Sequence, residues 1–204
     1  MRSGTPTLRT VTLSLEPAAA PEAFALGLLS LQAVLDSPPR TGLELRTVPA
    51  PRKLAPWSFA VAAEVCRDGG DVASGRFVVL HDPAGQDGWG GDTRIVAFVE
   101  AQVEAEMAAD PVLADVGWSW LLEALAGRGA QHAVAGGTVT RTVSKRFGQL
   151  EDAEDASEVE VRASWTAVSG DEGLGLGRHL LAWCDLLCST AGLPPEGVAA
   201  LHPR

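Results

Sequence analysis

The sequence has little of what would mark a secreted, membrane-spanning or polyanion-binding protein. Its 204 residues include three cysteines, Cys66, Cys184 and Cys188, an odd number in a chain too long to depend on disulfides. We therefore expect reduced thiols and a cytoplasmic location. No uninterrupted apolar run of about 18 residues occurs, so the sequence predicts no membrane-spanning helix. The apolar start is broken by prolines and glutamates, which argues against a signal peptide.

Positive charge is also scarce. Sixteen lysines and arginines face 26 aspartates and glutamates, which leaves a net charge of −10 and disfavours bulk nucleic acid or an anionic membrane as a partner. Only two of the cations are lysines and tyrosine is absent, a skew typical of GC-rich coding sequence. The charge is uneven, because residues 151–160 carry six acids whereas residues 40–53 carry four cations and one acid. A small anion site therefore stays open as a possibility.

Composition and length indicate one folded unit with loose ends. Apolar residues make up 46% of the chain and charged residues 21%, which is ordinary globular usage. Residues 1–19 are rich in Thr, Ser, Ala and Pro and are expected to form a flexible leader, with one short strand at Val11–Leu15. We expect a single α+β domain over residues 20–196 and a C-terminal tail over residues 197–204.

Hydrophobic periodicity predicts three helices and about five to six strands. Apolar spacings of three and four indicate helices over about 21–36, 111–126 and 176–191. Their expected buried stripes are Phe24, Leu28, Leu31 and Leu35; Leu113, Val116, Trp120, Leu121 and Leu125; and Leu176, Leu180, Trp183, Leu187 and Ala191. Alternation of apolar and polar residues indicates strands at 43–48, 57–65, 75–81, 95–103, 134–145 and 157–167, although the end of the fourth fits a helix equally well.

The order of these elements contains no βαβαβ alternation. It predicts an α+β fold, with a mainly antiparallel sheet of about five to six strands and three amphipathic helices packed largely on one face. The other face of the sheet is then open to solvent, as the polar half of the alternation requires.

The segment from His81 to Asp92 is the richest in chemical groups. It holds His81, Asp82, Asp87, Trp89 and Asp92 among four glycines, and Arg52 is an expected anion clamp beside it. Converging carboxylates and imidazole would suit a general base or a divalent cation, but the spacing matches neither a calcium loop nor a zinc site. The alternatives are a turn-rich connector, in which the aspartates bond nearby amides, and a ligand or partner loop.

Basic residues gather in two further places. Arg46, Arg52 and Lys53 lie near one strand, and a second group, the expected anion patch, lies at the end of another: Arg141, Lys145 and Arg146. If the two groups adjoin, they would form an anion pocket or a small RNA contact. Otherwise they are solvated charges that discourage pairing at a strand edge.

The last helix offers weaker candidates. Cys184 and Cys188 share one side of it, without the spacing of a redox or zinc motif, and are expected in the core. The preceding glycine-rich run, Gly173–Gly177, is more consistent with a flexible lead-in than with a phosphate loop. No serine-nucleophile motif occurs, so we assign no catalytic residue, no metal ligand and no cofactor.

Several separate segments carry a family resemblance. They are 49–56 (PAPRKLAP), 80–87 (LHDPAGQD), 106–111 (EMAADP), 118–120 (WSW), 137–140 (GTVT) and 181–188 (LAWCDLLC). Together they resemble an uncharacterised actinobacterial family, the domain of unknown function numbered three thousand, over about residues 21–196. The resemblance implies no activity, cofactor or catalytic residue.

The function expected from the sequence is therefore a non-catalytic binding or interaction module. Its partner would be another protein or a second copy of the chain, bound through the open sheet face or the His81–Asp92 loop. The alternatives are a small-ligand-binding protein or enzyme that uses this loop, and a weak RNA contact through Arg141, Lys145 and Arg146.

Overall fold

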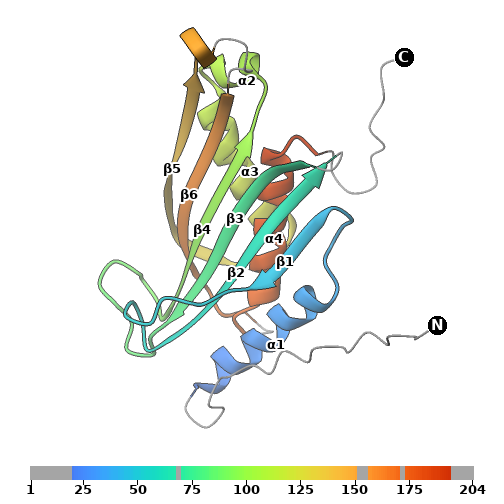
Figure 1. Cartoon of the computed structure of the whole chain (residues 1–204). Coiled ribbons are helices and arrows are strands. Elements are labelled where there is room, and N and C mark those ends of the chain that lie inside the picture. The colour runs from blue at the N-terminus through green and yellow to red at the C-terminus, as the bar shows by residue number, and fades with distance from the viewer. Residues whose placement is uncertain (1–19, 68–69, 151–155, 171–172, 194–204) are drawn as a thin grey trace, which may run out of the picture.

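The structure is a computed structural model that describes residues 20–67, 70–150, 156–170 and 173–193 (Figure 1). The expected leader with its short strand, and the expected tail, lie outside these residues. The elements in chain order are α1 (Glu22–Asp36), β1 (Leu43–Thr47), β2 (Trp57–Arg67), β3 (Gly70–His81), β4 (Thr93–Gln102), α2 (Ala105–Ala109), α3 (Leu113–Gly127), β5 (His132–Ser144), the 3-10 helix η1 (Gly148–Leu150), β6 (Ala156–Ala167) and α4 (Leu176–Thr190).

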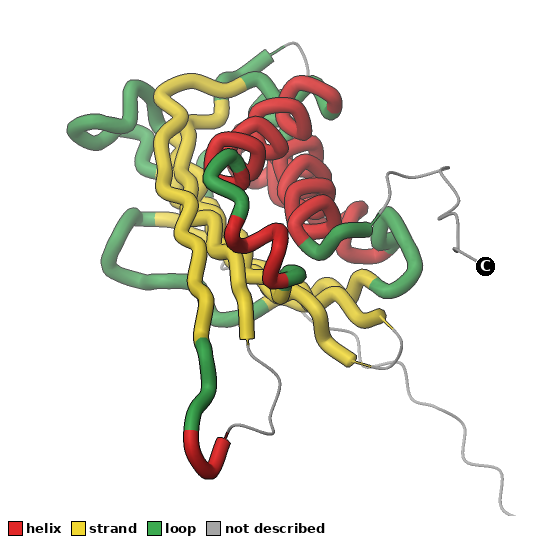
Figure 2. The backbone as a smooth tube through the Cα atoms, turned by 90° about the horizontal axis from the view of Figure 1, so that it is seen from above, coloured by secondary structure: helices red, strands yellow, loops and turns green. Residues whose placement is uncertain are grey.

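Six strands form one antiparallel sheet in the order β1-β2-β3-β4-β6-β5. The helices gather on one side of the sheet, and the strands curve around that side (Figure 2). The predicted α+β class with an open antiparallel sheet is confirmed, and the segment after β4 that fitted either strand or helix forms the short helix α2. None of the helices within the described ranges has the length and apolar content needed to cross a membrane.

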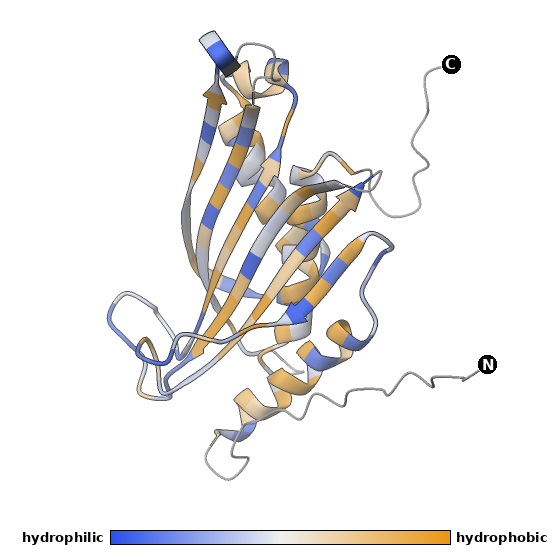
Figure 3. Ribbon diagram, viewed as in Figure 1, coloured by the Kyte–Doolittle hydropathy of each residue, from blue (hydrophilic) through white to orange (hydrophobic). Residues whose placement is uncertain are grey.

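The strands form where the sequence alternates, and the alternation divides the sheet into a covered and an open face. On β4, Ile95, Ala97 and Val99 are buried beneath the helices, whereas the side chains between them belong to the open face. Figure 3 shows the resulting alternation of hydrophobic and hydrophilic positions along the strands. One face therefore supplies the core and the other is available for contacts.

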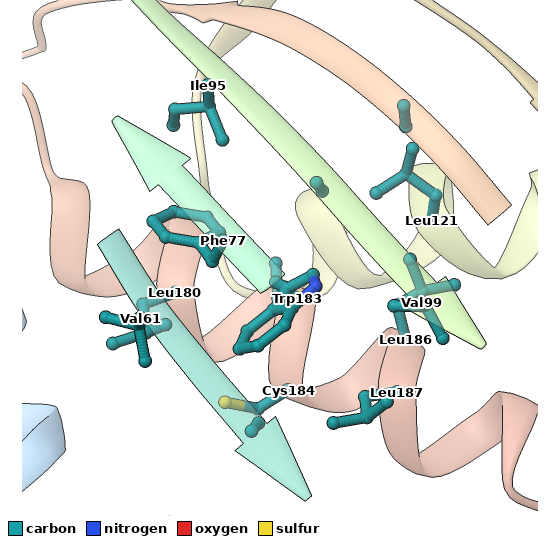
Figure 4. Close-up of a cluster of buried hydrophobic side chains, with 14 of the residues drawn as sticks. Val61, Phe77, Ile95, Val99, Leu121, Leu180, Trp183, Cys184, Leu186 and Leu187 are labelled. Atoms are coloured by element: carbon teal, nitrogen blue, oxygen red, sulfur yellow. The ribbon is translucent and has the colours of Figure 1, made fainter. Parts of the chain in front are cut away.

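Helix α4 lies at the centre of the core. Trp183 packs against Phe77 of β3 with ring centroids 5.7 Å apart, and its indole N–H donates to the Phe98 carbonyl at 3.2 Å (Figure 4). A Cβ on Gly75 would lie 2.7 Å from the Trp183 ring, so this strand position has room only for glycine. The predicted stripe of α4 is confirmed, because all five of its residues are buried.

The other two long helices pack on α4 from different sides. Gly177 lets α1 approach, since a Cβ there would lie 2.6 Å from the Ser30 carbonyl oxygen. The stripe predicted for α3 is partly wrong: Val116 is exposed, and buried Gly117 takes its place against Val139 of β5. The reason is that close helix–sheet packing selects a small residue, which a hydrophobicity pattern does not reveal.

Candidate functional site

The loop between β3 and β4 is held mainly by its own turns. Asp82 accepts hydrogen bonds from the Ala84 amide and the Gln86 side chain, both at 3.1 Å, and Gln86 also donates to the Leu54 carbonyl at 3.0 Å. Gly85 has a φ of +70°, which favours glycine. Asp82 thus builds the turn, and Gln86 joins this loop to the loop between β1 and β2.

His81 does not face the loop. As the last residue of β3 it belongs to the covered face, where it is 2% exposed and stacks on Phe24 of α1 with centroids 5.1 Å apart. The chain of hydrogen bonds runs from His81 Nδ1 to Thr93 Oγ1 (2.8 Å), whose hydroxyl donates to Asp92 (2.7 Å). Burial lowers the pKa of His81, against the opposing effect of the nearby carboxylates. Its Nε2 is enclosed and unpartnered among the described residues, so the ring is not reachable as a general base.

The remaining loop candidates are only partly brought together. Asp87 and Asp92 line a hollow of about 450 Å³, but His81, Trp89 and Arg52 do not. The backbone carbonyl of Trp89 accepts a hydrogen bond from the Thr166 hydroxyl, which anchors the loop to β6. No cluster of three potential metal-ligating side chains occurs in the described part of the chain. The loop is therefore built as a connector with two exposed carboxylates.

The two basic groups lie at opposite edges of the sheet, because Arg46 is on β1 and Arg141 is on β5. They do not form a joint anion pocket. Arg141 donates to the carbonyls of Ala108 (3.1 Å) and Asp110, where it binds the C-terminal end of α2. Lys145 lies 6.0 Å from the centre of the Phe147 ring.

Arg146 is the member of the expected anion patch that lines a hollow. With Arg67, Gln102 and the end of α4 it borders a space of about 760 Å³ at the upper end of the sheet in Figure 1. Ser157 also borders it, but its hydroxyl is buried and has no hydrogen-bond partner within the described residues. The three residues of the expected anion patch therefore have different surroundings: Arg141 binds α2, Lys145 lies near the Phe147 ring, and Arg146 borders the hollow.

The two thiols of α4 are part of the core. Cys184 and Cys188 are buried, and burial raises the pKa of the Cys184 thiol. Beside them Asp185 accepts two hydrogen bonds from Arg128, which follows α3, at 2.6 and 2.7 Å. This pair fastens α3 to α4 next to a protonated thiol, so the arrangement is structural.

The open face of the sheet is an exposed surface to which several strands contribute. Its centre is an apolar strip formed by three side chains on β3 and β4: Val78, Val96 and Phe98. Val96 is 39% exposed, although it lies in the middle of a central strand. A contiguous apolar patch on an otherwise polar face is the kind of feature that marks a contact surface.

Arginines flank this strip. Arg162 of β6 lies over the Phe98 ring at 5.5 Å and donates to Glu160 at 2.7 and 2.9 Å, which lowers the pKa of Glu160. Arg94 is held by the Ser164 hydroxyl (2.7 Å) and the Val134 carbonyl (2.8 Å). Aromatic and arginine side chains with few lysines are the composition that protein-binding surfaces favour.

The alternation predicts this face and, on β6, its residues, but it does not predict that Val78, Val96 and Phe98 adjoin. The signal was present, since each of Val78, Val96 and Phe98 alternates with a buried neighbour on its own strand. What was missing was the strand order, which alone places these three side chains next to one another.

The fold and the surface define the class of protein: an α+β protein with helices on one face of an open antiparallel sheet and an apolar, arginine-flanked strip on the other. A family model described as "Protein of unknown function (DUF3000)" matches residues 20–199. This match covers most of the chain, and the protein belongs to the DUF3000 family. No curated protein and no solved structure matches the chain.

Proposed function

We propose that the protein is a non-catalytic interaction module that binds another polypeptide through the open face of its sheet. The strip of exposed Val96 and half-buried Val78 and Phe98, with arginines beside it, supports this proposal. Arginine is one of the residues that contribute most to binding energy at protein interfaces, and Arg162 lies against the Phe98 ring on this face. The surrounding charged side chains would form the polar rim of such an interface.

The candidates in the β3–β4 loop support the proposal by their arrangement. Asp82 and His81 are engaged within the fold, and Asp92, which lines the hollow with Asp87, accepts a hydrogen bond from Thr93 and lies 3.9 Å from His81 Nδ1. A general base must reach the proton that it abstracts, and the buried Nε2 of His81 does not. The loop is better suited to bordering the open face than to chemistry of its own.

The experiment compares two matched valine variants of the full chain. Val96→Glu places a charge in the apolar strip, and Val116→Glu makes the same change on α3, on the helical side, where the valine is 37% exposed. Each immobilised protein is incubated with native lysate, and the retained proteins are quantified by mass spectrometry. We expect a protein that is retained by the wild type and by Val116→Glu and is lost with Val96→Glu.

Circular dichroism and thermal melting show first that both variants are folded. An identical set of retained proteins for the two variants would contradict the proposal, because a charge in the centre of a binding surface must cost affinity whereas a charge elsewhere must not.

A further inference from the structure

The register of the sheet aligns four glutamates in one row across the open face. Glu44 pairs with Glu64, Glu64 with Ser74, Ser74 with Glu100, and Glu100 with Glu160. Two of these contacts, Glu44 with Glu64 and Glu100 with Glu160, place like charges directly opposite each other. Such pairs destabilise an antiparallel sheet.

A second row, one step along the strands, carries the opposite charge. Arg46 pairs with Ala62, Ala62 with Arg76, Arg76 with Phe98, and Phe98 with Arg162. Residues two apart on a strand are about 7 Å apart, so this arginine row runs parallel to the glutamate row at that distance.

Ion pairs within the molecule neutralise only part of the two rows. Arg46 bonds Glu64 at 2.9 Å, and Arg162 bonds Glu160 at 2.7 Å. Within the described residues, Arg76, Glu44 and Glu100 make no ion pair or side-chain hydrogen bond, and Glu100 acts on Arg162 only at a longer distance. The two rows therefore keep one cation and two anions, at the centre and edge of the face, that lack a contacting partner of opposite charge within the described residues.

We propose that a second copy of this chain covers the open face, and that the two copies are related by a twofold axis that runs between the rows. This proposal rests on the proposed function and names its partner. A surface with two parallel rows of opposite charge is complementary to itself, because the rotation places each arginine row over the glutamate row of the other copy. Identical surfaces in a twofold dimer must be self-complementary in this way.

The axis brings equivalent strands of the two copies together. Arg76 of one copy then lies between Glu64 and Glu100 of the other, and Arg46 lies over Glu44 of the other. Each group that lacks a contacting partner in the fold gains one of opposite sign. The apolar strip beside the rows is covered in the same step.

The size of the contact predicts a weak dimer. Six strands span about 24 Å, but β1 has only five residues and the sheet curves around its helical side, so the contact covers less than about 600 Å² per copy. Specific interfaces of standard size cover about 800 Å² per partner, so this contact is at the lower end. Association should therefore be reversible and dependent on concentration.

The test uses charge reversals in the full chain, measured by sedimentation velocity from about 1 µM to about 1 mM protein at about 0.1 M salt. We expect the mass of the wild type to rise from 21.2 kDa towards twice that value. Arg76→Glu and Glu100→Arg should each raise the dissociation constant about tenfold, because each places like charges in two symmetric contacts. Glu123→Arg, on the exposed side of α3, is the control and should leave association unchanged.

Mixing the two variants gives the decisive measurement. In an equimolar mixture, the heterodimer sets the new glutamate of the Arg76→Glu copy against the new arginine of the Glu100→Arg copy in one contact. Its other contact is the native pair of Arg76 and Glu100. Association should therefore return close to the wild-type level. Thermal melting of each variant shows beforehand that it is folded.

Three results would overturn the dimer: a wild-type chain that is monomeric at all concentrations, a dimer that both reversals leave intact, or a mixture that associates no better than its components. The Val96→Glu comparison separates these results from a failure of the proposed function. A monomer that still loses a retained protein when Val96 is changed contradicts the dimer alone. If the charge reversals leave association intact and Val96→Glu leaves retention intact, both the dimer and the proposed function are contradicted.

Discussion

Acidification should destabilise the protein through His179, a buried histidine of α4. Its ring is 1% exposed, and its Nδ1 accepts a hydrogen bond from the Trp165 indole N–H at 3.1 Å. The neutral ring therefore carries its proton on Nε2, and protonation of Nδ1 would break this bond. Burial, with a smaller effect from His132, lowers the pKa of His179 from 6.5 to about 4.

The sign and size of the effect follow from this shift. Below pH 6.5 the unfolded chain binds a proton at His179 while the folded protein does not, so the free energy of unfolding falls as the pH decreases from 6.5 to about 4. At about 1.4 kcal/mol per pKa unit the complete loss is about 3 kcal/mol. Between about pH 7.5 and about pH 4.5 the loss is about 2.5 kcal/mol.

Urea unfolding at several pH values in this range measures the effect. His179→Asn keeps an acceptor near the position of Nδ1 but removes this titration, so the variant should be less stable at neutral pH and should lose less stability on acidification than the wild type. Buried His81, whose pKa is also lowered, contributes equally to the loss in both proteins. His132→Asn is the control: it should keep the wild-type loss, slightly reduced. If the stabilities of the wild type and of His179→Asn fall in parallel with pH, the reasoning is refuted.

Three further predictions concern packing, thiol protection and the contact between α3 and α4. Gly137→Ala should destabilise the protein by about 1–3 kcal/mol, because a Cβ there would lie 2.2 Å from the Arg162 carbonyl oxygen. Gly136→Ala is the control and should not destabilise it, because the space around Gly136 is open. Equal melting temperatures of the two variants would contradict this prediction. A thiol reagent should modify half-buried Cys66 in the native protein and the two thiols of α4 only on unfolding, and rapid reaction of all three would be inconsistent with their burial. A double-mutant cycle on Arg128 and Asp185, each changed to Ala, should give a coupling energy of about 0.5–1 kcal/mol, because both side chains are partly exposed. Additive effects of the two substitutions would show that the ion pair contributes nothing to stability.

Periodicity was sufficient to predict the helices and strands because burial on this fold is one-sided. The alternation on β6 predicted which residues face the core, and Val159, Val161 and Trp165 are buried as expected. The stripe of α4 was equally readable. In both elements one face is uncharged along the whole length of the element, and this face determines which side packs on the core.

Strand order and close packing could not be read in this way. β6 pairs with β4 although α2, α3 and β5 separate them in the sequence, and no local pattern states which edge of the sheet a returning strand joins. Gly117 and Gly137 are also invisible to a hydrophobic pattern, because their role is to leave space for a neighbour.

The candidate site shows the same division between local pattern and long-range pairing. His81 follows Phe77 and Val79 at a spacing of two, so its place on the covered face was open to prediction from the alternation. Arg141 likewise follows Val139 and turns to the helical side, where it binds the carbonyls at the end of α2. Charge and chemistry group His81 and Arg141 with their sequence neighbours. The face of the sheet on which each side chain lies determines what it contacts.

The net charge of −10 and the two charge rows act over different distances. Repulsion between two acidic copies extends over the whole molecule and is screened within about 8 Å at physiological salt, whereas ion pairs in contact are screened much less. Very low salt should therefore weaken a dimer through its net charge, and very high salt should weaken it through the arginine and glutamate rows. Association strongest at intermediate ionic strength distinguishes contact through these rows from purely apolar contact, which salt would only strengthen.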